Sequence, residues 1–195
     1  MTLQLTRKHS FDLVFDSQKV YRSILEAMSN PGGIVNIQEY ADKLYGDYPV
    51  LLAVAMTLLD NEVSFCTCDN NSLTDEIASL TLAGRESVEA ADFIFVSDLG
   101  YMEYAIENAK CGTLSDPHKS ATIIILNEIE PTHRLKLHGP GIVGQAEVML
   151  TQAAKDAVTI RDAQNYEYPK GIDLLFVSGA GELSAIPRLT RIEVV

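Results

Sequence analysis

Apolar side chains recur along the chain with two different periods, and this alternation predicts an α/β protein. In residues 16–29, Val20, Ile24 and Met28 are spaced four residues apart, which places them on one face of an α-helix. Residues 50–59 are apolar almost throughout and predict a second helix, buried on all sides, with Pro49 in its first turn.

Polar residues mark where the predicted helices begin, because a side-chain oxygen there can accept a hydrogen bond from a free backbone amide. Further helices are predicted over residues 72–80, 98–110 and 151–166. The predicted N-caps are Asp16, Ser72 (with Asp75 completing a capping box), Asp98 and Thr151.

Short apolar runs between the helices predict strands. The clearest run, residues 122–126, contains three successive isoleucines and no polar alternation, as in a strand buried on both faces. The other predicted strands are residues 34–37, 63–67, 93–96, 135–137, 146–149, 172–178, 183–186 and 192–195. Helices and strands alternate early and strands cluster late. We therefore predict one α/β domain over residues 1–195, a three-layer arrangement with a mixed sheet that is antiparallel in its C-terminal part, preceded by an arm at residues 1–10.

Composition and charge exclude several classes of protein. The 195 residues are 47% hydrophobic and 22% charged, which fits an ordinary globular domain rather than a coiled coil or a disordered chain. The net charge of −12 argues against nucleic-acid binding, which needs a basic face. No signal peptide or membrane-spanning segment is recognisable, so we expect a cytoplasmic protein without a membrane partner.

A glycine-rich segment at residues 139–144 matches the G-x-G-x-x-G pattern of dinucleotide-binding proteins. That reading requires a helix directly after the glycines, so that free amides meet the pyrophosphate. Here residues 145–149 alternate like a strand, and we interpret the segment as a glycine-rich turn.

Three cysteines raise the question of metal or redox chemistry. Cys66 and Cys68 lie two residues apart on a predicted strand and so share one face. Cys111 and His118 would have to complete a zinc site, but these spacings fit no common zinc motif. A Cys111–His118 nucleophile pair is a second alternative. We favour buried cysteines acting as small hydrophobic residues, and predict no metal.

Four strings, taken in order, resemble one known family. They are 21–32 (YRSILEAMSNPG), 58–63 (LLDNEV), 169–174 (PKGIDL) and 185–190 (AIPRLT). By these strings the chain, over about residues 11–195, is similar to the PhnH family, whose members are subunits of the bacterial carbon–phosphorus (C–P) lyase system of phosphonate use.

The resemblance implies a function and a set of partners. PhnH proteins act with the G, I and J subunits in a core complex that activates alkylphosphonates with MgATP, releasing adenine and forming a ribose 1-phosphonate 5-triphosphate. The family fold is similar to the large domain of pyridoxal-phosphate (PLP)-dependent transferases, but the family does not bind PLP, so no cofactor is expected on this subunit. Isolated members form homodimers. We expect the same in this chain.

Four residues are candidates for ligand or interface contacts. Arg188 could hold a phosphonate or phosphate in a bidentate fork, and Arg22 could do the same or pair with Glu26 one turn on. Asp60 could accept a hydroxyl or hold a turn. Asp173 opens a buried strand, where an unpaired carboxylate would be costly, so we expect it to meet Arg188 or a backbone amide. No catalytic residue is assigned.

Three functions remain open at this stage. The favoured one is an assembly subunit with little chemistry of its own, which predicts exposed apolar residues on the first helix and the C-terminal strands. A free-standing transferase or hydrolase, and a phosphonate or nucleotide carrier, are the alternatives. Lys119 and Lys170 are the least implausible Schiff-base lysines, and we interpret both as solvated charges at strand entries.

Overall fold

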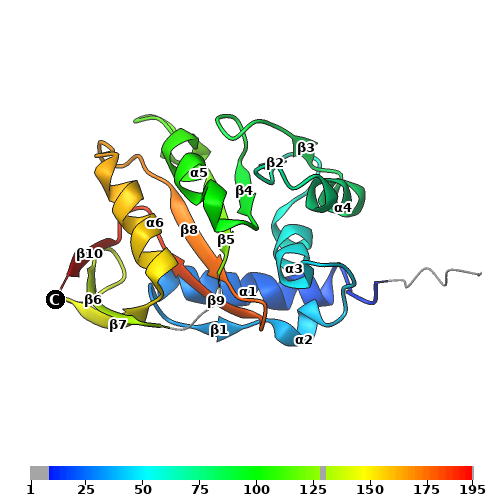
Figure 1. Cartoon of the computed structure of the whole chain (residues 1–195), viewed down its shortest axis with the longest axis horizontal. Coiled ribbons are helices and arrows are strands. Elements are labelled where there is room, and N and C mark those ends of the chain that lie inside the picture. Colours follow the sequence, from blue (N-terminus) through cyan, green and yellow to red (C-terminus); the bar gives the residue numbers. More distant parts are fainter. Residues whose placement is uncertain (1–8, 128–130, 195) are drawn as a thin grey trace, which may run out of the picture.

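A twisted, seven-stranded mixed sheet runs through the middle of the molecule, which the computed structural model describes over residues 9–127 and 131–194 (Figure 1). Its strand order is β1-β9-β8-β5-β4-β2-β3. The strands are β1 (Val35–Asn36), β2 (Ser64–Cys66), β3 (Gly84–Arg85), β4 (Phe93–Val96), β5 (Thr122–Leu126), β8 (Asp173–Val177) and β9 (Glu182–Ile186). Strands β3, β2, β4, β5 and β8 are parallel. At one edge β9 pairs antiparallel with β8, and β1 pairs antiparallel with β9. The predicted mixed α/β sheet is confirmed; of the predicted arm, residues 1–8 lie outside the described residues.

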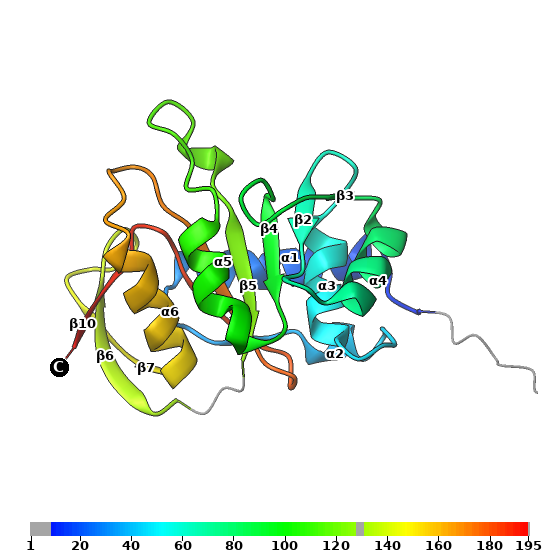
Figure 2. The same cartoon turned by 45° about the horizontal axis from the view of Figure 1, so that its top comes forward.

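Helices cover both faces of this sheet (Figure 2). The α-helices are α1 (Phe15–Ser29), α2 (Gln38–Ala41), α3 (Pro49–Leu58), α4 (Asn71–Thr81), α5 (Met102–Asn108) and α6 (Gln152–Ala163), with 3₁₀ turns η1 (Leu99–Tyr101) and η2 (Pro117–Lys119). Side chains alternate across a strand, so Ile124 of β5 packs with α1, α3 and α4, while Ile123 and Ile125 pack with α5 and α6.

A second, three-stranded sheet lies beside the first and corrects the prediction of a single sheet. It consists of β6 (His133–His138), β7 (Ala146–Leu150) and β10 (Arg191–Val194), in the order β10-β6-β7 and antiparallel throughout. Leu135, Leu137 and Leu150 turn inward and join the core under α5 and α6. The alternating pattern predicts that a segment is a strand, but not which sheet it joins. The glycine segment 139–144 connects β6 to β7 as a turn, as predicted.

Two predicted helix caps are wrong. Asp12, not Asp16, accepts from the amides of Val14 and Phe15 at the start of α1, at 2.8 and 2.9 Å. Asn70, not Ser72, accepts from the amide of Leu73 at the start of α4. In each case the capping residue lies a few positions before the predicted one.

The other two caps are placed correctly. Asp98 accepts from the amide of Gly100, although it opens η1 ahead of α5 and the helix ends at Asn108. Thr151 caps α6 through the amide of Ala154, at 3.0 Å.

Candidate functional site

Asp173 and Arg188 form an ion pair at the edge of the sheet where the parallel strands begin. The Asp173 side chain is 9% exposed and the Arg188 side chain 22%. Arg188 Nη2 donates to Oδ2 of Asp173 at 2.5 Å, Nε donates to Oδ1 at 3.3 Å, and the Arg188 amide donates to Oδ1 at 2.7 Å. The predicted pairing is therefore confirmed, with the arginine and a backbone amide both contributing.

The remaining arm of the Arg188 fork is also bound to the protein. Nη1 donates to the carbonyl of Pro117 in η2, so the guanidinium joins β8, the segment after β9 and the η2 loop. Gly171 packs against the Arg188 stem: a Cβ there would lie 3.0 Å from Arg188 Cβ. The Nε–Nη2 edge of the guanidinium, which would hold a phosphonate in a bidentate fork, is already bound to Asp173, and Nη1 is bound to Pro117. This geometry favours a positioning role for the pair.

Arg22 and Asp60 are not brought to this pair. Arg22 is exposed on α1, and within the described residues it forms no ion pair with Glu26 or any other carboxylate. Asp60 is exposed after α3, where its Oδ1 accepts from the Glu62 amide at 2.8 Å and holds a turn. Neither residue contributes to a shared site with Asp173 and Arg188.

The sequence analysis missed Arg161, the largest fully buried side chain among the described residues. It lies in α6, is 1% exposed, and donates to the carbonyls of Ile186, Pro187 and Thr190. Burial lowers the pKa of its guanidinium, although the Asp162 carboxylate opposes that effect. Arg161 thereby fixes the chain segment that carries Arg188.

A second missed pair links α1 to the segment after α2. Lys43 Nζ lies 2.7 Å from Oδ1 of the buried Asp16, whose Oδ2 accepts from the Asp12 amide at 2.8 Å. Burial alone would raise the pKa of Asp16, but these hydrogen bonds outweigh it and leave the pKa below its usual value. Asp16 therefore has a structural role rather than the predicted capping role.

Cys66 and Cys68 both border the core under α5 and α6, as their spacing predicts, although β2 ends at Cys66 and Cys68 adopts a positive φ of 47°. A hydrogen bond from the Cys68 thiol lowers the pKa of Cys66 to about 6 and raises that of Cys68. The Cys111 thiol lies 3.8 Å from the carbonyl of Gly112 rather than bonding to His118. In the described part of the chain, no group of His, Cys, Asp and Glu side chains is arranged to hold a metal ion.

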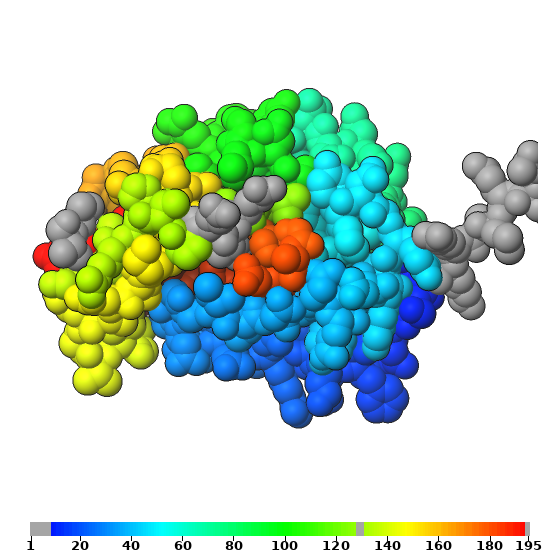
Figure 3. Space-filling model, turned by 60° about the horizontal axis from the view of Figure 1, so that its bottom comes forward, coloured from blue at the N-terminus to red at the C-terminus, as the bar shows by residue number. Residues whose placement is uncertain are grey.

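The opposite edge of the sheet, where the parallel strands end, carries a pocket of about 620 Å³. It is lined by Ser97, Asp98, Leu99, Leu126, Asn127 and Gly179, from the loops after β4, β5 and β8. Figure 3 shows the side of the molecule where the β8–β9 turn (orange) comes to the surface beside the segment of β1 and α2 (light blue). None of the described residues that line it carries a positive charge.

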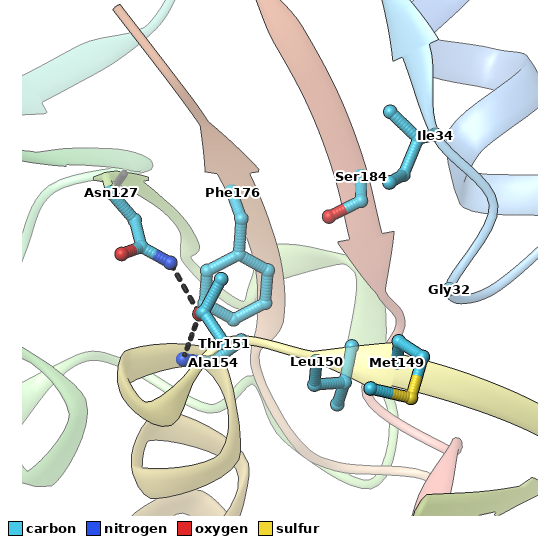
Figure 4. Close-up of a pocket in the computed structure, with 9 residues that line it drawn as sticks. All are labelled: Gly32, Ile34, Asn127, Met149, Leu150, Thr151, Ala154, Phe176 and Ser184. Carbon is cyan, nitrogen blue, oxygen red and sulfur yellow. Dashed lines mark hydrogen bonds between the residues drawn. The ribbon is translucent and has the colours of Figure 1, made fainter. Parts of the chain in front are cut away.

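A smaller gap lies between α6, β8 and β9 (Figure 4). Asn127 Nδ2 donates to Oγ1 of Thr151 at 2.5 Å, while Phe176 fills the space behind them. The gap holds only about 10 Å³, room for a single water molecule. It therefore belongs to the core, and the wider pocket at the strand ends is the better ligand site.

Known proteins match the chain over most of its length. A family model described as "Bacterial phosphonate metabolism protein (PhnH)" matches residues 9–193. A relative from Stutzerimonas stutzeri, described as a C-P lyase subunit protein, HtxG, is 27% identical over 176 residues, covering 90% of this chain and 85% of the relative. A second relative is described as alpha-D-ribose 1-methylphosphonate 5-triphosphate synthase subunit PhnH of Rhizobium meliloti (strain 1021). It is 25% identical over 186 residues, covering 93% of this chain and 92% of the relative.

Proposed function

The chain belongs to the PhnH family of bacterial phosphonate metabolism proteins, and from this premise we propose that it is a subunit of a C–P lyase system. Its task in this proposal is to support the step in which MgATP and an alkylphosphonate give a ribose 1-phosphonate 5-triphosphate and adenine. The protein acts in the cytoplasm with G, I and J subunits. It serves chiefly in assembly, binds no PLP, and forms a homodimer when isolated.

The observation that carries the assembly role is an exposed apolar stripe along α1. Val14, just before α1, and Tyr21 and Leu25 within it are 70%, 47% and 48% exposed, and their spacing of seven and four residues places them on one side of the helix. Side chains of this N-terminal segment (dark blue) protrude at the lower edge of Figure 3. Large apolar side chains gathered on one exposed face are typical of a surface that a partner covers. This is the first-helix surface that the sequence predicted.

The charged candidate residues support the same proposal. Arg188 is bound to Asp173, and Arg161 is bound to backbone carbonyls. These charged groups therefore stabilise the fold and are not free to act as reactive groups. Lys119 is exposed and lies 3.6 Å from Asp116, and no lysine is among the described residues that line the 620 Å³ pocket.

Co-expression tests the proposal directly. A tagged chain is produced with candidate G, I and J subunits, the complex is captured, and its mass and its turnover of MgATP with methylphosphonate are measured. We expect a stoichiometric complex that releases adenine, while the tagged chain alone is inert. Turnover by the chain alone, or a complex of G, I and J that is fully active without it, would contradict an assembly role.

The 620 Å³ pocket gives one alternative a physical basis. A carrier without catalysis would use such a pocket to bind a small molecule in the absence of partners, and its volume lies within the range of ligand sites. Calorimetry on the isolated protein with MgATP or methylphosphonate distinguishes the two functions. Tight binding of either compound, with no capture of partner subunits, would favour the carrier.

A further inference from the structure

The pocket lies at the carboxyl ends of β4, β5 and β8, next to the point between β2 and β4 where the connections of the sheet change direction. After β2 the chain enters α4, which packs in the core with α1 and α3, whereas after β4 it enters α5, which packs on the other face. In open α/β sheets, ligands bind outside the carboxyl ends of the strands at such a switch point. The pocket begins with Ser97 and Asp98, the two residues that follow β4.

Asn127 lines this pocket and carries a free acceptor. The residue is 7% exposed, and its Nδ2 is bound to Thr151, which also caps α6 through the Ala154 amide. This fixes the side chain with its carbonyl oxygen directed away from Thr151 (Figure 4). That oxygen has no hydrogen-bond partner among the residues the structure describes.

Asp98 and Ser97 add a second acceptor and one donor. Oδ1 of Asp98 accepts from the Gly100 amide at 2.9 Å, which holds the carboxylate in place and leaves Oδ2 available. Ser97 Oγ accepts from Nδ2 of Asn70 at 2.8 Å, so the Ser97 hydroxyl proton remains available to a ligand. Asn70 is itself fixed as the N-cap of α4. The polar residues of the pocket are therefore held at the ends of β4 and β5 and by the start of α4.

The chemistry of the lining selects the ligand. The described residues that line the pocket supply one carboxylate, one amide oxygen and one hydroxyl, with Leu99 and Leu126 as apolar walls, and include no lysine, arginine or histidine. Phosphate groups need cationic or amide donors, which these side chains do not supply. A pair of adjacent hydroxyl groups suits a carboxylate, as in the ribose contact of dinucleotide-binding folds.

We infer that this pocket binds the ribose of a nucleoside, with Asp98 accepting from the sugar hydroxyls and Asn127 Oδ1 accepting a further hydrogen bond. The inference rests on the donors and acceptors of the pocket and not on the proposed function. The two have separate tests, because capture of partner subunits involves no nucleoside and nucleoside binding involves no partner. Failure of one leaves the other standing.

Adenosine is the probe, and the protein is the whole purified chain. Saturation-transfer NMR and calorimetry are expected to show saturable binding of adenosine, about tenfold weaker binding of 2′,3′-dideoxyadenosine, and no gain in affinity for AMP, because the removed hydroxyls bond to a charged group. The inference would be overturned by any of three results: absence of saturable binding, equal affinity for the dideoxy compound, or clearly tighter binding of AMP.

Two variants locate the site. Asp98→Asn removes the charge but keeps an oxygen for the Gly100 amide, and is expected to weaken adenosine binding about tenfold. Gly179→Leu is expected to abolish binding, because a Cβ at Gly179 has open space around it and the added side chain enters the pocket.

Each variant has a matched control. Asp60→Asn changes an exposed, turn-forming aspartate outside the pocket, and Ala180→Leu adds the same side chain at an exposed neighbouring position. Both controls are expected to bind adenosine like the unmodified protein. Should Gly179→Leu fail to fold, Asp98→Asn decides alone. Unchanged binding in Asp98→Asn, or equal losses in a variant and its control, would overturn the assignment.

Discussion

Asp173 and Arg188 illustrate how a residue that looks reactive in sequence becomes structural in the fold. A charged residue at the start of a buried strand must find a partner, because an unpaired buried carboxylate is costly. Burial therefore predicts that Asp173 needs a partner, and both expected partners, Arg188 and a backbone amide, bind it. Burial alone does not predict that Pro117, 71 positions before Arg188, would occupy the rest of the fork.

Removing the arginine tests this structural role. Arg188→Ala is expected to lower the free energy of unfolding by about 3 kcal/mol, because the Asp173 carboxylate stays buried and loses its countercharge. Urea denaturation measures the change. Arg22→Ala, an exposed arginine without an ion pair in the described chain, is the matched control and is expected to change stability by less than about 0.5 kcal/mol. A loss below about 1 kcal/mol in Arg188→Ala would instead favour a ligand role for this residue.

Cys66 offers a second test at the same scale. The hydrogen bond from Cys68 stabilises the Cys66 thiolate and sets its pKa at about 6, so Cys66 is expected to react with iodoacetamide already at neutral pH. Replacing the donor in Cys68→Ala should raise the midpoint of the alkylation rate from about 6 towards the ordinary thiol value of about 8.5.

The alkylation experiment is performed in a Cys111→Ser background, so that only one partly exposed thiol remains. That background alone is the control and should retain the low midpoint. A midpoint that stays the same after Cys68→Ala would show that the hydrogen bond does not set the reactivity of Cys66.

At the scale of elements, the hydrophobic pattern predicted the buried strands well and the polar contacts poorly. Strands β4 and β5 fall on the predicted residues 93–96 and 122–126, because both are covered on two faces and their apolar runs leave little choice. Asp16 looks like a cap but is bound to Lys43, a contact that spans 27 positions and leaves no local signal. Two short elements, α2 and β3, were missed because two to four residues carry no period.

Arg161 could have been found from its spacing. Ala154, Val158 and Arg161 are buried positions of α6, spaced four and then three residues apart. Arg161 therefore lies on the apolar face of that helix. An arginine at such a position must be satisfied by buried acceptors. The acceptors themselves, three carbonyls at the end of β9 and in the segment after it, depend on the tertiary fold and could not be predicted.

Arg161→Lys tests how α6 holds the C-terminal segment. The shorter, single ammonium cannot reach all three carbonyls, so the free energy of unfolding is expected to fall by about 3 kcal/mol, with faster amide exchange in β10. Arg134→Lys, an exposed arginine paired with Glu147, is the control and should change stability by less than about 0.5 kcal/mol. Equal effects in the two variants would mean that the carbonyl contacts contribute little.

At the scale of the whole molecule, the two edges of the main sheet have different roles, and one helix, α1, has an exposed apolar stripe. The edge where the parallel strands begin is locked by Asp173, Arg188 and Arg161, and the edge where they end holds the 620 Å³ pocket. Within the described residues, no helix has the length and apolar content to cross a bilayer. The exposed stripe of α1 is thus the surface that best suits a protein partner.

The mass of the captured complex measures the central claim most directly. Tyr21→Glu and Leu25→Glu place charges on the α1 stripe without touching the core, since both side chains are about half exposed. When either variant is tagged and co-expressed with G, I and J subunits, we expect a folded chain that captures at least tenfold less of its partners, because a buried, unpaired charge in an interface costs several kcal/mol. Leu114→Glu changes a similarly exposed leucine in the loop before η2, away from α1, and this control variant should capture the full complex. Full capture by both α1 variants would contradict the account.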